Sequence, residues 1–149
     1  MSIAKIGLIM AALTLTIAGF FIFTNRVQVV MDGQLAASGE PWTLAFYPDR
    51  QTETGTCLRL SVPADSMEFD WCTTLQQPVE AQIARTPSIG TVIVGWVQEG
   101  SVQSSVAGEI QISDPIDNGS SRRLFIQFVP AETESATISV DGLETKVAG

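Results

Sequence analysis

Short apolar stretches alternate with turn residues along most of the chain, and no long segment after residue 26 repeats its apolar positions with helical spacing. Alternation with a period of two predicts strands that are half buried in a sheet. Residues 27–31 belong either to a short tether (27–40) or to a first strand. The other expected strands, roughly nine, cover 41–48, 56–62, 67–72, 79–84, 90–98, 105–112, 122–129, 136–140 and 143–147.

Two of these segments carry stronger signals than the rest. Residues 90–98 are almost wholly apolar and rich in β-branched side chains, which favours a central strand. Asp141-Gly142 separates the last two apolar runs. This dipeptide is typical of a two-residue hairpin turn, so we expect 136–140 and 143–147 to pair.

Strands that recur about every 8–15 residues are typical of an all-β fold, and here they predict an antiparallel β-sandwich over residues 41–149. This spacing is similar to that of immunoglobulin-like exported domains at the level of pattern. The tryptophan between two distant inter-sheet cysteines is missing, because Cys57 and Cys72 are only fifteen positions apart. The pattern therefore identifies no family.

One pairing register explains the segment from Cys57 to Cys72. If Val62 and Met67 close a hairpin around residues 63–66, apolar residues lie opposite apolar residues, opposite charges pair, and the two cysteines face each other. The opposed pairs are then Leu60–Phe69 and Leu58–Trp71 on one face, and Ser61–Glu68, Arg59–Asp70 and Cys57–Cys72 on the other. A slip of one residue would bring opposite faces together and remove every match.

The same register favours a disulfide between Cys57 and Cys72 over the alternatives. A zinc or iron–sulfur site needs about four ligands, and two thiolates in a chain without histidine cannot supply them. A redox pair usually has the spacing C-x-x-C, and a catalytic thiol needs an imidazole partner. A structural bridge requires only an oxidising compartment outside the cytosol.

An export segment that would supply this compartment precedes the strands. Residues 6–23 are uncharged and as a helix would span about 27 Å, near the ~30 Å of a bilayer core. We expect residues 1–26 to be an uncleaved single-pass anchor with its helix at about 3–23. A cleaved signal peptide, with a small-residue site around Ala18, is the alternative. Lys5 and the amino terminus on one side, against Arg26 on the other, favour a cytoplasmic N-terminus and an extracellular or periplasmic domain.

The expected helix has one stripe of small residues, which allows a second helix to approach closely. The stripe consists of Gly7, Ala11, Thr14 and Ala18. It indicates a membrane-protein partner in addition to the lipid bilayer.

Charge and composition exclude several classes of function. After residue 26 the chain holds six basic residues against all sixteen acidic ones, which opposes binding to nucleic acid. The absence of histidine removes imidazole bases and the nucleophile activation that depends on them. Acidic pairs at alternate positions are typical of solvated strand faces, so we expect no enzyme and no cofactor.

One segment offers a weak metal candidate. Asp114, Asp117 and Asn118 are close in sequence and carry oxygen ligands that suit calcium. The spacing of a calcium-binding loop is absent, and these residue types also favour turns. We therefore expect a turn here and no metal.

Together these patterns predict a non-enzymatic membrane protein with an exported β domain. The expected function is that of an accessory or scaffold subunit of a larger membrane complex. The alternative is a tethered module that binds a soluble ligand or a component of the cell envelope.

Overall fold

The computed structural model describes residues 27–149 except 36–37, 50, 52–54, 75 and 117–120. The expected anchor (1–26), its helix (3–23) and the small-residue stripe therefore lie outside the described residues. Within the described part, no helix has both the length and the apolar character needed to cross a membrane.

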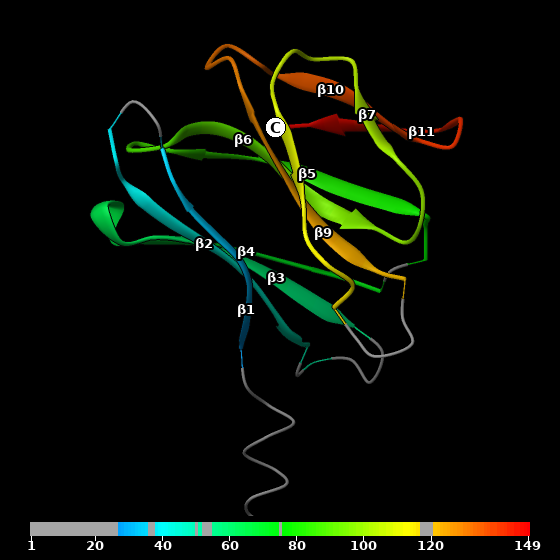
Figure 1. Cartoon of the computed structure of the whole chain (residues 1–149), viewed down its shortest axis with the longest axis horizontal. Coiled ribbons are helices and arrows are strands. Elements are labelled where there is room, and N and C mark those ends of the chain that lie inside the picture. Colours follow the sequence, from blue (N-terminus) through cyan, green and yellow to red (C-terminus); the bar gives the residue numbers. More distant parts are fainter. Residues whose placement is uncertain (1–26, 36–37, 50, 52–54, 75, 117–120) are drawn as a thin grey trace, which may run out of the picture.

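The described strands form three sheets, and every strand pairing is antiparallel, which confirms the all-β prediction (Figure 1). The first sheet has the order β1 (Gln28–Gln34), β2 (Pro41–Pro48), β3 (Thr56–Val62), β4 (Met67–Thr73). The middle sheet has the order β5 (Val79–Thr86), β6 (Gly90–Val97), β9 (Arg123–Val129), β8 (Ile110–Ile112). The third sheet has the order β11 (Leu143–Ala148), β10 (Ser135–Val140), β7 (Val102–Ser104).

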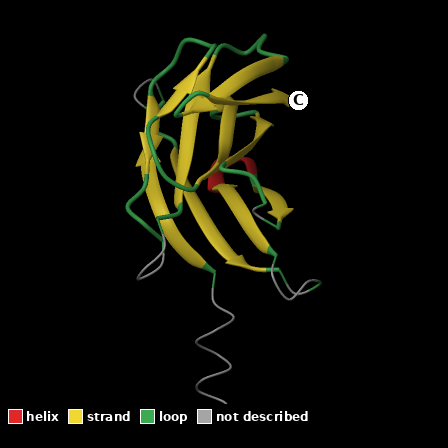
Figure 2. Cartoon of the chain, turned by 90° about the vertical axis from the view of Figure 1, so that its right-hand side faces the viewer, coloured by secondary structure: helices red, strands yellow, loops and turns green. Residues whose placement is uncertain are grey.

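Two apolar cores lie between the three sheets, whose strands are seen from the side in Figure 2. The first core lies between the first and middle sheets and includes Leu58 and Leu60 of β3. The second core lies between the middle and third sheets and includes Ile138 and Val140 of β10. The layering of sheets face to face agrees with the sandwich prediction, and the third sheet extends it.

The position of β6 explains its unbroken apolar sequence. Val92, Val94 and Trp96 face the first core, whereas Ile93 and Val97 face the second. A strand covered on both faces cannot alternate between apolar and polar residues, because the polar residues would then all be buried on one of its faces. The prediction of a central strand at 90–98 is thus confirmed.

The pairing of β3 with β4 follows the predicted register at every position. Val62 lies opposite Met67, Arg59 opposite Asp70 and Cys57 opposite Cys72. A single 3-10 turn, η1 (Pro63–Asp65), closes this hairpin. Asp65 accepts hydrogen bonds from the backbone nitrogen (2.9 Å) and the hydroxyl of Ser88, so the hairpin tip is joined to the turn between β5 and β6.

The hairpin predicted at Asp141-Gly142 is also confirmed. Val140 pairs with Leu143, and the two turn residues have φ angles of 49° and 85°. Positive φ at both central positions is what a type I′ turn requires, and Asp followed by Gly tolerates it.

The prediction of one strand over residues 105–112 is wrong. The chain instead leaves the third sheet after β7, crosses over residues 105–109 and enters the middle sheet as β8. Gly108 has a φ of 145°, and a Cβ on it would lie 2.1 Å from the carbonyl oxygen of Phe128. The crossing is held by Gln127, whose Nε2 donates to the carbonyl oxygens of Val106 (2.9 Å) and Gly108 (3.2 Å).

Residues 28–34 form β1 at the edge of the first sheet. The sequence had left two alternatives for this region, a tether or a first strand. A bulge between Val29 and Met31 interrupts the pairing of β1 with β2. A bulge of this kind makes a sheet edge a poorer template for a further strand.

Candidate functional site

The outer face of the first sheet gathers most of the polar residues that the sequence singled out. Side chains at alternate positions of β2, β3 and β4 point away from the first core and form rows across the sheet. One row contains Tyr47, Cys57 and Cys72, the next Val29, Ala45, Arg59 and Asp70, and the third Asp32, Thr43, Ser61 and Glu68.

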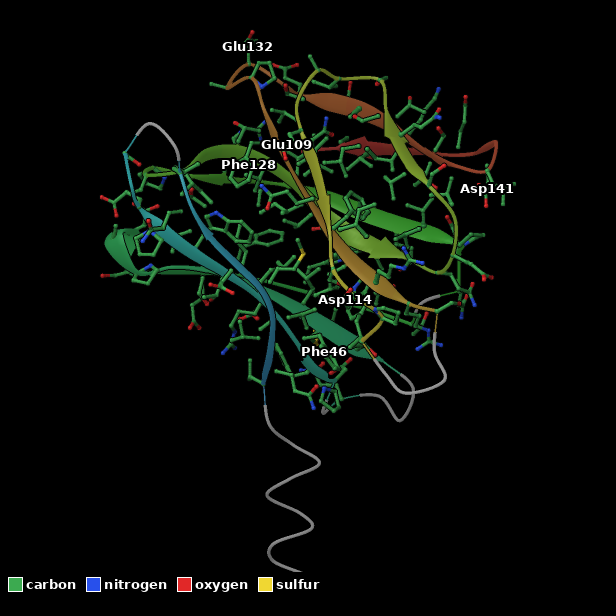
Figure 3. All side chains as sticks on the ribbon, viewed as in Figure 1. Phe46, Glu109, Asp114, Phe128, Glu132 and Asp141 are labelled. Atoms are coloured by element: carbon green, nitrogen blue, oxygen red, sulfur yellow. A yellow bond between two sulfur atoms is a disulfide. The ribbon has the colours of Figure 1, made fainter. Side chains whose placement is uncertain are left out.

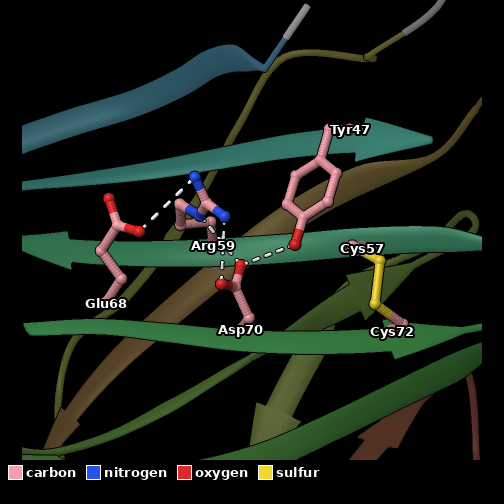
Figure 4. A network of polar contacts seen from close by, with 6 residues as sticks. All are labelled: Tyr47, Cys57, Arg59, Glu68, Asp70 and Cys72. Carbon is pink, nitrogen blue, oxygen red and sulfur yellow. Dashed lines mark hydrogen bonds and ion pairs between the residues drawn. A yellow bond between two sulfur atoms is a disulfide. The ribbon is translucent and has the colours of Figure 1, made fainter. Parts of the chain in front are cut away.

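Four of these residues form a polar network, which we call the outer-face network: Tyr47, Arg59, Glu68 and Asp70 (Figure 4). Arg59 donates from Nε to Oδ1 of Asp70 at 2.9 Å and from a terminal nitrogen to Oδ2 at 3.1 Å. The Tyr47 hydroxyl donates to Oδ1 of Asp70 at 2.7 Å, and Glu68 lies 3.5 Å from the guanidinium. The guanidinium carbon also stands 5.0 Å from the centre of the Tyr47 ring.

The network raises the pKa values of Tyr47 and Arg59 and lowers that of Asp70. Burial and the hydrogen bond to Asp70 raise the pKa of Tyr47 above its usual value of 10.0, although the Arg59 charge opposes this. Burial alone would raise the pKa of Asp70, but hydrogen bonds from Arg59 and Tyr47 outweigh it and lower this pKa. The hydrogen bond to Asp70 raises the pKa of Arg59 still further above its normal range.

The shift of Asp70 argues against a role for this residue as a general acid. A carboxyl group that acts as a general acid must keep its proton near neutral pH, which requires a raised pKa. Asp70 has the opposite shift, so it is a charged acceptor for side chains of β2 and β3.

A disulfide joins Cys57 and Cys72 beside this network, with the two Cα atoms 3.9 Å apart. A carboxylate oxygen of Asp49 lies within 4.8 Å of both sulfur atoms, a grouping that would suit a metal ion if the thiols were free. The bridge removes both thiolates as ligands, because each sulfur is already bonded to the other. The choice of a structural disulfide over a metal site therefore agrees with the structure.

The weak calcium candidate is only partly described. Asp114 is exposed in the segment between β8 and β9, and Asp117 and Asn118 lie outside the described residues. Figure 3 shows Asp114 well apart from Glu109, Glu132 and Asp141, so these acidic side chains do not gather into one patch.

Sequence reasoning missed two features of the site region. Tyr47 joins the network because β2 pairs with β3, and no local pattern indicated that register. A small pocket with room for about 10 Å³ also lies at the end of the middle sheet. Its walls come from three separate segments and consist of Gln77, Pro78, Trp96, Val97, Gln98 and Arg122.

A second, wider hollow of about 270 Å³ is at the tip of the β3–β4 hairpin, lined by Ser61, Val62, Pro63, Ser66 and Glu68. Its walls are mostly small and polar.

Comparisons of the chain with protein-family models, with curated proteins and with solved structures found no match.

Proposed function

We propose that the protein is a non-enzymatic, single-pass membrane protein whose exported β domain is an accessory or scaffold subunit of a larger membrane assembly. The observation that carries the proposal is the start of β1 at Gln28. If the anchor helix ends near residue 23, only residues 24–27 separate it from a strand already paired with β2.

The shortness of this connection favours a subunit over a tethered module. Four extended residues reach at most about 14 Å, so the first sheet would stay close to the bilayer. A module that captures soluble ligands benefits from a long, flexible linker, whereas a subunit that docks on its neighbours benefits from a short connection that fixes its distance from the membrane.

The surface near the start of β1 also suits a neighbouring protein. Val27 and Val29 are 44% and 59% exposed, and both are apolar. The disulfide lies in the row next to the pair Gln28–Phe46, so the same end of the domain is covalently braced. An anchor with a cytoplasmic N-terminus would place this disulfide in an extracellular or periplasmic compartment, where such bonds persist.

The absence of imidazole and of free thiols supports the non-enzymatic part of the proposal. The chain has no histidine, and its two cysteines are joined. An immunoglobulin-like arrangement of the sheets, preceded by the anchor helix, remains part of this proposal.

The importance of the short connection can be tested by inserting ten Gly/Ser residues between Arg26 and Val27 in the full chain. A subunit that depends on this short connection should lose stoichiometric co-purification with its membrane partners in mild detergent. The same insertion between Asp141 and Gly142, at an exposed hairpin turn, is the matched control and should leave co-purification intact. Retention of the partners by the first variant would instead favour the tethered binding module.

The helix stripe offers a second test of the same proposal. Replacement of Gly7, Ala11 and Ala18 by Leu should abolish partner binding without changing membrane insertion, because the bulkier side chains keep a second helix at a distance. Replacement of Leu8, Leu13 and Leu15 by Ile is a control in the same segment. Equal partner recovery from both variants would contradict packing through the stripe.

A further inference from the structure

Trp96 lines the small pocket at the end of the middle sheet, and its indole carries a donor that lacks an acceptor. The Trp96 side chain is only 3% exposed, and its Nε1 has no hydrogen-bond partner among the described residues. The indole N–H can only donate, and leaving it buried without an acceptor is unfavourable. A native structure usually satisfies such a group with a bound water, ion or ligand.

The ring of Trp96 is held in place on several sides. It makes an edge contact with Phe46, with ring centres 6.2 Å apart, and its strand is paired on both sides, with Glu80 and with Leu124. The indole therefore cannot turn to find another acceptor without disturbing the first core. The connection from β4 to β5 closes the site, since the backbone nitrogen of Gln98 donates to the carbonyl oxygen of Pro78 at 2.8 Å.

The size and charge of the pocket restrict what can enter it. A space of about 10 Å³ admits one water-sized atom and excludes a ring or a whole phosphate group. Arg122 lines the same pocket and supplies a positive charge with several N–H donors. Glu80 also lies on this side of the sheet, but its carboxylate accepts a hydrogen bond from Thr73 of β4 and does not line the pocket.

We propose that this pocket binds a carboxylate group of a ligand, with one oxygen on the Trp96 N–H and the other at the mouth with Arg122. A carboxylate is flat, so one oxygen can enter a water-sized space while the second stays outside. Charge-assisted hydrogen bonds to a guanidinium are about twice as strong as neutral ones. The site is at the end of the domain where β1 begins, but the proposal does not depend on the membrane assembly.

The indole N–H signals of the full-length protein in detergent provide a direct test. The chain has three tryptophans, so a ¹⁵N-labelled sample should give three indole signals, and Trp96→Phe identifies one of them by its loss. Sodium acetate at constant ionic strength should move the Trp96 signal in a saturable way and leave the signals of Trp42 and Trp71 in place. Acetamide, a neutral molecule of the same shape, should not move it.

Two arginine variants separate the site from general electrostatics. Arg122→Gln should weaken the apparent acetate affinity by about tenfold or more, because the charged donor at the mouth is lost. Arg123→Gln removes the same charge from the neighbouring residue, which does not line the pocket, and should leave the affinity within about twofold. The pair remains informative even if Trp96→Phe fails to fold.

Three outcomes would overturn the proposal. Absence of a saturable shift would mean that the pocket holds only water. An equal response to chloride and acetate would mean a site for any small anion. Equal loss of affinity in the two arginine variants would mean that the response reflects overall charge and not this pocket.

Discussion

The phenol of Tyr47 contacts both members of the Arg59–Asp70 ion pair, with its hydroxyl on Asp70 and its ring beside Arg59. An exposed ion pair alone contributes only about 0–1 kcal/mol. The network therefore matters mainly for how β2, β3 and β4 hold their outer side chains. Because the pKa of Asp70 is lowered on folding, its share of stability is present above pH ~4 and is lost as the pH falls further.

Tyr47 gives this network a single spectroscopic reporter, since it is the only tyrosine in the chain. We expect the tyrosinate absorbance to rise with a midpoint above pH 10. In Asp70→Asn the midpoint should fall, because the negative charge is removed while Arg59 remains, and a neutral amide oxygen is a weaker acceptor than a carboxylate. Because folding raises this pKa, stability is fully present below pH ~10 and decreases as the pH rises through the folded value.

Glu68→Gln is the control for this titration. It removes the same charge from the same strand, but Glu68 does not contribute to the pKa shift of Tyr47. Equal movement of the midpoint in both variants would contradict a specific bond between Tyr47 and Asp70.

At the scale of elements, β7 and β8 depart most from what their sequence suggests. Residues 105–112 contain strand-forming side chains, yet the middle of the segment is a crossing between sheets. Its backbone is held by a side chain of β9, because Gln127 is fully buried and donates twice to the crossing. Its Oε1 has no partner among the described residues, so the site is only half satisfied.

Gln127→Met should loosen the crossing without a large change in global stability. Methionine keeps the shape of the side chain, and the loss of two hydrogen bonds is offset by removal of an unsatisfied buried oxygen. We expect the free energy of unfolding to change by less than about 1 kcal/mol. Amide hydrogen exchange of residues 105–109 should accelerate several-fold. Gln111→Met in β8 is the matched control. Equal acceleration of exchange at residues 105–109 in this variant would contradict the role of Gln127.

At the scale of the whole molecule, the two cores share the middle sheet. Strands β6 and β9 contribute residues to both cores, alternately from their two faces. If either the first or the third sheet separated from the middle sheet, one face of the middle sheet would be exposed to water. We therefore expect the described part of the chain to unfold as one cooperative unit.

Ile138→Ala tests this cooperativity, because the tryptophans report on the opposite core. Ile138 is fully buried in the second core, whereas Trp42, Trp71 and Trp96 pack in the first. The substitution should lower the free energy of unfolding by about 2–5 kcal/mol. Tryptophan fluorescence and circular dichroism should shift to lower denaturant by the same amount. A fluorescence transition that stays in place would show that the cores unfold separately.

Local patterns were sufficient for the hairpins. In the β3–β4 hairpin a short loop leaves few possible registers, and only one matches apolar, charged and cysteine residues together. The turn at Asp141-Gly142 depends on the backbone freedom of those two residues alone. The continuous apolar run of β6 likewise required burial on both faces, wherever its neighbours came from in the chain.

Only the tertiary structure decided how distant segments meet. Alternation marks a buried face without saying which sheet covers it, so the position of the third sheet and the crossing at 105–109 had no local signal. Tyr47 reaches Asp70 only through the pairing of β2 with β3, and the Trp96 pocket needs three segments brought to one place. The sequence by itself thus determined most of the strands, the two hairpin turns and the disulfide, because these depend on residues close together in the chain. The stacking of the sheets, the outer-face network and the pocket depend on long-range contacts, which the order of residues along the chain does not reveal.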